Sequence, residues 1–342
     1  MFCVAPNGLR PALCLLSRCV NLEGLLPICP MDAAPSAPLQ LWPLEALPSL
    51  PPLRIAVVGH VEWVSLVAVE QLPQPGTISQ GSAFREEPAG GGAVVAACLA
   101  RLLGQPVPFF TALGRDPIGQ QAAERLQALG LALHVAWREA PTRRGLSLVD
   151  GQGDRAITVI GERLSPTAAD PLPWGELASC DGVFVTACDA PGLRACRQAR
   201  VLAATPRLRL PVLQQAGVPL DALIGSGLDP GEALPDGALQ PPPRLRIATE
   251  GAAGGLATPG GRFAAPRLTA PVIDSYGCGD SFAAGVTAGL AAGWSLEQAI
   301  SLGCHCGAAC ATHLGPYPPE PADGGQAAEQ LNPSADAPAE LG

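Results

Sequence analysis

The sequence contains no lysine, because all 21 of its basic residues are arginine. This absence excludes a Walker A P-loop, whose lysine reaches the β- and γ-phosphates of a nucleotide. It also excludes any enzyme that forms a Schiff base with a lysine of its own. A nucleotide-phosphate site in this chain must therefore be built without lysine.

Acidic residues outnumber basic ones, so the chain has a formal charge of −9 and a pI near 5.0. Nucleic acids and anionic membrane surfaces both require a basic face, so neither is expected as a partner. The twelve cysteines include no CxxC pair and are too sparse for a secreted disulfide framework. Cys304, His305, Cys306 and Cys310 fall in a predicted helix, where neighbouring residues point about 100° apart, so we expect buried side chains rather than a metal site.

The 342 residues could form two average domains or one large α/β domain with appendages. We expect residues 1–52, which are rich in proline, to lie outside the fold. They contain no apolar run near the ~18 residues that a membrane span needs. Met31 is the only methionine after Met1, and we hypothesise that translation starts there. The predicted domain spans residues 53–318, and residues 319–342 have the composition of a disordered tail.

Strand-like and helix-like patterns alternate between residues 53 and 317. The predicted strands are 55–58, 107–113, 182–186, 201–204 and 246–249, and the predicted helices are 93–103, 118–129, 280–292 and 295–313. Such alternation is typical of a three-layer α/β/α sandwich. Two segments interrupt it, at about 61–88 and 143–161, and the second is a predicted hairpin with turn residues at 150–154.

Residues 274–281 read Asp-Ser-Tyr-Gly-Cys-Gly-Asp-Ser and run into a predicted helix with an apolar stripe at Phe282, Val286 and Leu290. Gly277 and Gly279 allow a tight turn with positive φ. Because the N-terminus of a helix presents unpaired N–H groups and a positive dipole end, this turn is a predicted anion site. Asp280, in the first turn of the helix, would lie beside the anion as a general base.

This stretch resembles the second signature, D-T-x-G-A-G-D, of the ribokinase (phosphofructokinase-B) family of sugar and nucleoside kinases. The resemblance implies that the backbone of Gly277, Cys278 and Gly279 forms an anion hole for the transferring phosphoryl group. It implies that Asp280 binds the acceptor hydroxyl and takes its proton, and that Asp274 lies near the phosphates or the metal.

Three further stretches resemble the family. Gly90-Gly91-Gly92, with residues 110–119, is similar to the first signature, whose glycines approach the sugar. Glu62 stands near the place of a carboxylate that binds sugar hydroxyls. Residues 249–255 resemble the nucleotide loop, which implies contacts of Thr249, Gly251 and Gly254 with ATP.

The resemblance implies a ribokinase-like α/β/α fold with a small β-lid over the sugar. It also implies ATP and Mg²⁺ as cofactors, a sugar-like substrate and a cytoplasmic location. The exposed edge of the lid is an expected homodimer surface. The sugar itself is not predicted. His60 could line the sugar site or simply be packed, and Arg143 and Arg144 could meet phosphate or solvent.

The sequence departs from the family in two places. The N-x-x-E motif that organises Mg²⁺ should follow residues 201–204, where this chain has Thr205, Pro206, Arg207 and Leu208. The asparagine of the first signature is also missing, since no asparagine occurs between residues 53 and 317. A weakly active or inactive sugar- or nucleotide-binding regulator on the same fold is therefore the alternative.

Two other enzyme classes fit poorly. A dinucleotide-dependent oxidoreductase requires G-x-G-x-x-G directly after the first strand, where this chain has Gly59, His60, Val61 and Glu62. A serine hydrolase requires G-x-S-x-G, and the surroundings of Ser226 lack that spacing.

Overall fold

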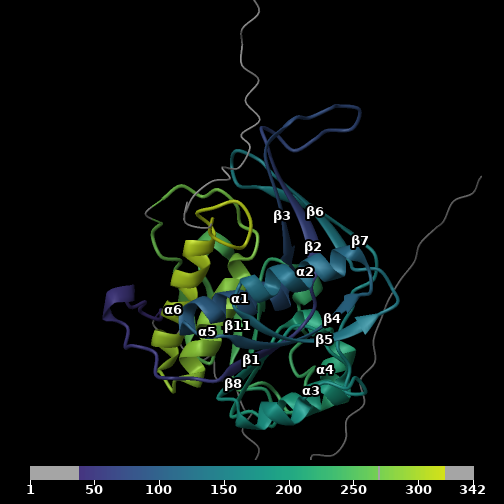
Figure 1. The fold of residues 1–342 in the computed structure, drawn as a ribbon. Helices are drawn as coiled ribbons and strands as arrows, with labels where there is room; N and C mark the ends of the chain where they lie inside the picture. The colour runs from purple at the N-terminus through teal and green to yellow at the C-terminus, as the bar shows by residue number, and fades with distance from the viewer. Residues whose placement is uncertain (1–37, 269, 320–342) are drawn as a thin grey trace, which may run out of the picture. The chain divides into compact units, whose positions relative to one another are not determined.

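The computed structural model describes residues 38–268 and 270–319 (Figure 1). A large sheet of nine strands has the order β13-β12-β11-β10-β9-β8-β1-β4-β5. Pairing is parallel from β11 through β5, and β12 and β13 add antiparallel strands at one edge. The strands are β1 (Ile55–Val58), β4 (Val107–Gly114), β5 (Leu131–Arg138), β8 (Gly182–Val185), β9 (Val201–Ala204), β10 (Ala222–Ser226), β11 (Arg246–Thr249), β12 (Gly255–Thr258) and β13 (Gly261–Phe263).

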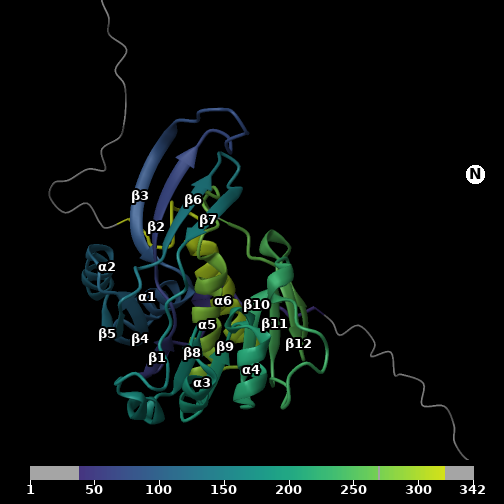
Figure 2. The ribbon, with the colours of Figure 1, turned by 90° about the vertical axis from the view of Figure 1, so that its right-hand side faces the viewer.

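Helices cover both faces of this sheet, which gives the three layers visible in Figure 2. One face is packed by α1 (Gly91–Leu103), α2 (Pro117–Ala128), α5 (Cys278–Ala291) and α6 (Leu296–Cys310). The other is packed by α3 (Ala190–Cys196), α4 (Leu210–Ala216) and the short 3-10 helix η2 (Trp174–Ser179). The predicted α/β/α sandwich is confirmed.

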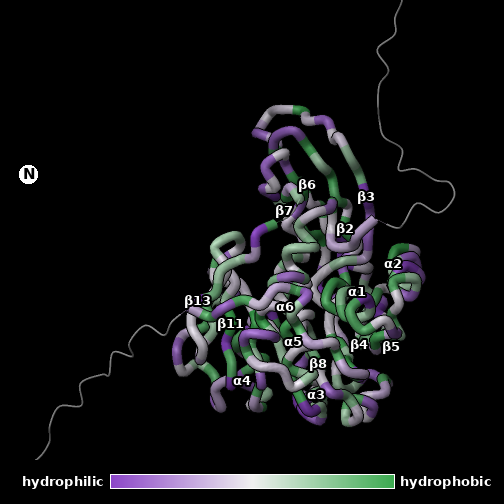
Figure 3. Tube along the Cα trace, turned by 90° about the vertical axis from the view of Figure 1, so that its left-hand side faces the viewer, coloured by the Kyte–Doolittle hydropathy of each residue, from purple (hydrophilic) through white to green (hydrophobic). Residues whose placement is uncertain are grey.

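The central strands are apolar throughout because both of their faces are buried. In β1, Ile55 and Val57 pack with the α1, α5 and α6 layer, while Ala56 and Val58 pack with the α3 and α4 layer. Figure 3 shows hydrophobic stretches in this layered body and a more mixed pattern in the strands above it. The carboxyl ends of the parallel strands meet at one edge, where α/β proteins place their ligands.

A second sheet stands above that edge and forms the predicted lid (Figure 2). Its strands are β2 (Glu62–Val69), β3 (Gly81–Ala89), β6 (Arg144–Val149) and β7 (Arg155–Ile160), in the order β3-β2-β6-β7. The β6–β7 turn forms as expected, because Asp150 Oδ1 accepts hydrogen bonds from the N–H groups of Gln152 and Asp154.

The residues just before position 53 were expected to lie outside the fold, but residues 39–50 pack against it. Leu39, Leu41, Leu47 and Leu50 pack against the main core. The N–H of Trp42 donates to Ser301 Oγ at 2.8 Å, and its carbonyl oxygen lies 2.9 Å from His305 Nε2 on α6. Apolar leucines between the prolines explain this packing. The hypothesised start at Met31 and the predicted tail after 319 lie outside the described residues.

The sequence patterns predicted most ends of α1, α2, α5 and α6 to within two or three residues of the observed ends. Capping explains where α2 and α6 begin. Asp116 accepts a hydrogen bond from the N–H of Gly119 at the start of α2, where Pro117 is the first residue. Ser295 and Gln298 form a capping box on α6. Six elements were not predicted from the sequence, namely β5, α3, α4, β10, β12 and β13. Among the described residues, no helix is long and apolar enough to cross a membrane.

Helices α5 and α6 cross closely because both present glycines at the contact. A Cβ added at Gly285 would lie 2.8 Å from the Cα of Gly303, and one added at Gly289 would lie 2.7 Å from the Cα of Ala299. A Cβ at Gly303 would lie 2.7 Å from Val286 Cγ2 and 2.8 Å from the Phe282 carbonyl oxygen. No side chain fits there without separating the helices.

We therefore expect Gly303→Ala to lower the free energy of unfolding by about 1–3 kcal/mol through overpacking. The measurement is urea unfolding followed by circular dichroism. Gly175→Ala is the matched control, because a Cβ at that position meets no atom within 4 Å. Equal stability of the two variants would contradict this account of the helix crossing.

Candidate active site

The N-termini of α1 and α5 meet at the carboxyl edge of the sheet, and Asp280 lies between them. A Cβ added at Gly91, the first residue of α1, would lie 3.0 Å from Asp280 Oδ1 and 3.5 Å from Thr186 Cγ2. Thr186 directly follows β8. The structure thus brings together Gly91 of the first predicted signature and Asp280 of the second, 189 positions apart in the sequence.

The other residues that were predicted to bind the sugar, which accepts the phosphoryl group, lie at the same place. Gly90 has φ +84°, and a Cβ on it would lie 3.2 Å from the His60 ring and 3.3 Å from Glu62 Cγ. A Cβ on Gly92 would lie 2.7 Å from the His60 carbonyl oxygen, so this glycine serves close backbone packing. The N–H of Gly90 donates to Tyr276 Oη at 3.3 Å, which links the two signatures directly.

The start of α5 has features that an anion site requires, with two departures from the prediction. Gly277 has φ +83° and is the N-cap, whereas Gly279 is helical and does not need its predicted positive φ. The N–H of Cys278 donates to the Ser275 carbonyl oxygen at 3.3 Å. Contrary to the prediction, this N–H group is therefore not free to bind an anion. Within the described chain, the N–H groups of Gly277, Gly279 and Asp280 have no protein acceptor.

Open space beside Gly279 makes this helix end accessible to an anion. A Cβ built on Gly279 meets no atom within 4 Å. Unpaired N–H groups and the positive end of the helix dipole both favour negative charge at such a position. The residues present therefore fit a phosphate group.

Asp280 is largely buried, and its side chain is 19% exposed. Burial raises the pKa of Asp280, the charge of Arg207 opposes that shift, and Glu232 adds to it. Arg207 Nη1 lies 3.5 Å from Asp280 Oδ1, and Arg207 Nε lies 2.6 Å from Glu232 Oε1. Arg207 and Glu232 were not among the predicted site residues. One indication of them was present in the sequence, because Arg207 stands where the N-x-x-E motif was expected.

His60 and Glu62 are buried next to the acceptor glycines. Arg143 Nε lies 3.1 Å from Glu62 Oε1 in an ion pair, and Glu62 was not among the expected partners of Arg143. His60 Nε2 lies 3.7 Å from Glu62 Oε1, and His60 Nδ1 lies 3.4 Å from Thr186 Oγ1. Burial, together with the charges of nearby arginines, lowers the pKa of His60, so the imidazole is neutral near pH 7. Burial also raises the pKa of Glu62.

The lid contacts the anion site through Arg155, at the start of β7. Its Nη1 donates to Ser275 Oγ at 2.9 Å, and its guanidinium carbon lies 5.8 Å from the centre of the Tyr276 ring. Arg155 also lowers the pKa of Asp280, though less than Arg207 does. The lid therefore contributes a positive charge to the surroundings of the Asp280 carboxylate.

Asp274 has a structural role, which differs from the prediction that it lies near phosphate or metal. It is fully buried, its Oδ1 accepts from the N–H of Tyr276, and its Oδ2 accepts from the N–H of Gly315, both at 2.9 Å. Both oxygens therefore hold the loop that precedes α5. In the part of the chain that the structure describes, no cluster of three or more His, Cys, Asp or Glu could hold a metal ion.

The predicted nucleotide residues lie after β11, at the same edge of the sheet. Thr249 Oγ1 donates to the Gly225 carbonyl oxygen at 3.3 Å, and Gly251 is exposed. Gly254, with φ +90°, closes the turn between β11 and β12, and a Cβ on it would overlap the Phe263 carbonyl oxygen. Its requirement for glycine is therefore explained by the turn. Glu250 is bridged to Arg262 and is not free to hold a metal.

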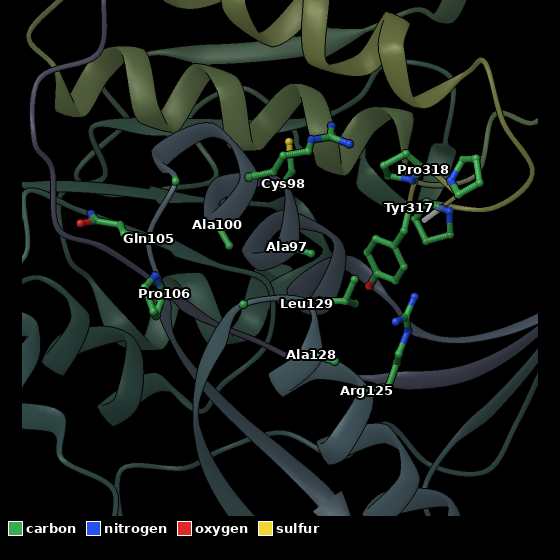
Figure 4. Close-up of a pocket in the computed structure, with 15 residues that line it drawn as sticks. Ala97, Cys98, Ala100, Gln105, Pro106, Arg125, Ala128, Leu129, Tyr317 and Pro318 are labelled. Carbon is green, nitrogen blue, oxygen red and sulfur yellow. The ribbon is translucent and has the colours of Figure 1, made fainter. Parts of the chain in front are cut away.

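A separate pocket of about 740 Å³ lies along α1 and α2 (Figure 4). Leu129, Tyr317 and Pro318 are among the residues that line it, and Arg125 stands at its edge. None of the predicted site residues lines this pocket. It ends at Pro319, the last described residue of the domain, and we assign it no part in the chemistry.

The role of Asp274 can be tested by stability. We expect Asp274→Asn to lower the free energy of unfolding by about 1–3 kcal/mol, because one buried backbone N–H loses its acceptor. Urea unfolding measures the change. Asp236→Asn removes the same charge from a fully exposed side chain and serves as the control. Normal stability of Asp274→Asn combined with weaker activation by Mg²⁺ would support the original metal assignment instead.

Comparisons with known proteins agree with this geometry. The curated ribokinase of Arabidopsis thaliana is 29% identical over 139 residues, which is 40% of this chain and 34% of that protein. The ribokinase structure from Thermotoga maritima has a TM-score of 0.60 and 21% identity, and the match covers 77% of this chain and 94% of that one.

Ribokinase structures with bound nucleotide also match. The enzyme from Cryptococcus neoformans in complex with ADP has a TM-score of 0.60 and 21% identity, with 78% of this chain and 95% of that chain covered. The Arabidopsis thaliana structure with ribose and ATP has a TM-score of 0.56 and 19% identity, with 76% and 92% covered. At these identities the structures establish the fold.

The family is established by the sequence profile of the pfkB family carbohydrate kinases, which matches residues 53–226 and 237–323. These segments contain both glycine signatures, Asp280 and the loop after β11. The chain therefore belongs to the pfkB family of carbohydrate kinases.

Proposed function

We propose that the protein transfers the γ-phosphoryl group of ATP to a hydroxyl of a sugar-like molecule. The observation that supports this most strongly is the position of a buried carboxylate, Asp280, in the first turn of a helix whose free N–H groups face open space. A base and an anion site are then adjacent, as phosphoryl transfer to a hydroxyl requires.

In the proposed reaction, Asp280 orients the acceptor hydroxyl and takes its proton. The acceptor oxygen bonds to the γ-phosphorus, and the bond from that phosphorus to the β–γ bridging oxygen breaks, so that ADP leaves with the electron pair. The N–H groups of Gly277, Gly279 and Asp280 stabilise negative charge on the phosphoryl oxygens. Such preorganised donors act without the lysine of a P-loop.

The acceptor would lie against Gly90 and Gly91, where no side chain separates the backbone from Asp280. Glu62, fixed by Arg143, would accept hydrogen bonds from further hydroxyls. The nucleotide would lie along the loop after β11, near Thr249 and Gly251. Mg²⁺, as a further part of the proposal, would enter with the ATP phosphates and water, because the carboxylates of Asp274 and Glu250 already have protein partners.

Arg207 supplies a fixed positive charge where the N-x-x-E motif is missing. It supports catalysis over the alternative of an inactive sugar- or nucleotide-binding regulator, because a binder needs no cation held against a buried base. We also propose a cytoplasmic location, where ATP is available. A homodimer through the lid is supported by exposed apolar side chains on β3 and β7, namely Phe84, Ile157, Val159 and Ile160.

Asp280→Asn should reduce kcat by roughly 10²–10⁴-fold, because the amide cannot take a proton. The fold should be retained, since burial already disfavours the charged form of this side chain. ADP release with Mg-ATP and a panel of pentoses, hexoses, their acids and phosphates measures the effect. Asp236→Asn is the control. Near-normal turnover by the Asp280 variant would refute the assignment of the base.

The pH dependence of kcat/KM should report Asp280 in the free enzyme. Because the base must be deprotonated and burial raises its pKa, activity should fall with decreasing pH at a higher pH than for an ordinary aspartate. Arg207 lowers that pKa, so Arg207→Gln should move the acid limb upward, by about one pH unit.

Arg194→Gln is the control, since Arg194 lies on α3 and donates only to the Gln215 carbonyl oxygen. Its profile should match that of the unmodified protein. An acid limb that stays fixed or moves downward in Arg207→Gln would show that another group controls the profile.

A further inference from the structure

Four arginines surround the acceptor side of the site. Arg143 precedes β6 and Arg163 follows β7, so both lie where the lid joins the body of the domain. Arg207 and Arg209 lie in and just after the 3-10 helix η3 (Pro206–Leu208). The charges of Arg143, Arg163 and Arg207 all act on His60 and on Glu62, which places them around the acceptor glycines.

Only two of these four arginines have a carboxylate partner. Arg143 pairs with Glu62, and Arg207 pairs with Glu232 and Asp280. Between residues 38 and 319, residue 269 aside, no acidic side chain forms an ion pair with Arg163 or Arg209. Two guanidinium groups of the cluster are therefore not balanced by an ion pair within the described residues.

Arg143 Nε is buried without a hydrogen-bond acceptor but pairs with Glu62, so Arg163 is the member of the cluster whose environment most requires a ligand. Its Nη1 donates to the Arg207 carbonyl oxygen at 3.0 Å, and its Nε is buried without a hydrogen-bond acceptor in the described structure. Burial and the like charges of Arg143, Arg209 and Arg207 lower the pKa of Arg163. A buried donor without a partner is costly, and an anion placed beside it would remove that cost.

On the basis of the proposed function, we propose that the acceptor carries an anionic group, which is either a carboxylate or a phosphate. Arg163 would bind this group together with Arg209 and the exposed part of the Arg207 guanidinium. The hydroxyl to be phosphorylated would then reach Asp280 from the same molecule. The anionic group fixes the acceptor at one end while the base acts at the other.

The position of the cluster assigns it to the acceptor rather than to ATP. On the nucleotide side, the arginine nearest the loop after β11 is Arg262, and it is already paired with Glu250. Arg163, in contrast, donates to the carbonyl oxygen of Arg207, whose guanidinium lies 3.5 Å from Asp280 Oδ1. The γ-phosphate already has the free N–H groups at the start of α5.

The first test compares matched acceptors with Mg-ATP and the full chain. One set is D-glucose, D-gluconate, D-glucuronate and D-glucose 6-phosphate, and a second is D-fructose and D-fructose 6-phosphate. We expect kcat/KM for an acidic acceptor to exceed that for its neutral parent by roughly 10–100-fold, as one or two charged hydrogen bonds allow. Comparing the sugar acids with the sugar phosphates shows whether the site prefers a carboxylate or a phosphate. A neutral sugar that is used as well as its acidic counterparts would overturn the inference and leave the kinase proposal intact.

The second test uses Arg163→Met, which keeps the apolar length of the side chain and removes its charge. It should raise the KM for the acidic acceptor at least tenfold, leave the KM for ATP within about twofold, and abolish the preference over neutral sugars. Arg163→Lys should recover part of the preference, since lysine keeps the charge without the planar fork. Arg194→Met, which also loses one hydrogen bond to a backbone carbonyl, should behave as the unmodified protein.

The remaining outcomes separate the two proposals. A raised KM for ATP with an unchanged KM for the acceptor would assign Arg163 to the nucleotide and overturn the inference. If no compound is phosphorylated, thermal stabilisation by the same acidic compounds decides: stabilisation that Arg163→Met removes supports the anionic site while the kinase proposal fails. Absence of both turnover and stabilisation by every acidic compound would overturn the inference.

Discussion

The site depends on the close approach of two helix N-termini. Gly91 begins α1 and Asp280 lies in the first turn of α5, and a single Cβ on Gly91 would come within 3.0 Å of the carboxylate. The hydrogen bond from Gly90 to Tyr276 joins the same two loops. Since both helices direct their positive dipole ends toward this space, negative charge is stabilised there before any ligand is bound. The burial of Asp280 and its position beside the free N–H groups of α5 follow from this one arrangement.

Arginine supplies the positive charges that lie against Asp280 and Glu62. Arg207 lies against Asp280 and Glu232, Arg143 lies against Glu62, and Arg155 connects the lid to the loop before α5. Each guanidinium stays charged at any working pH. The charge of these arginines is therefore permanent, while His60, beside Glu62, is kept neutral by burial.

Much of the fold could be predicted because it follows from local patterns. Apolar runs identified β1 and β9, and the glycine turn before α5 identified Gly277, Asp280 and the anion site. The positions of Arg163 and Arg207 could not be predicted, since Arg163 lies in a loop and Arg207 in a three-residue 3-10 helix, and their contacts join residues 25 to 73 positions apart in the sequence. Asp274 matched a signature position, but its complete burial and two backbone hydrogen bonds depend on Gly315, from beyond α6. Gly254 matched a nucleotide motif, although the turn before β12 already accounts for it.

The most direct test of the central claim is ³¹P NMR of the full chain with Mg-ATP and the best acceptor of the matched sets. The account predicts one new phosphate-ester resonance on the acceptor, formed in equal amount to ADP, with inorganic phosphate at the level of an enzyme-free control. ADP accompanied by inorganic phosphate alone would mean transfer to water and would contradict an acceptor placed against Asp280. No ADP with any acceptor would contradict catalysis itself.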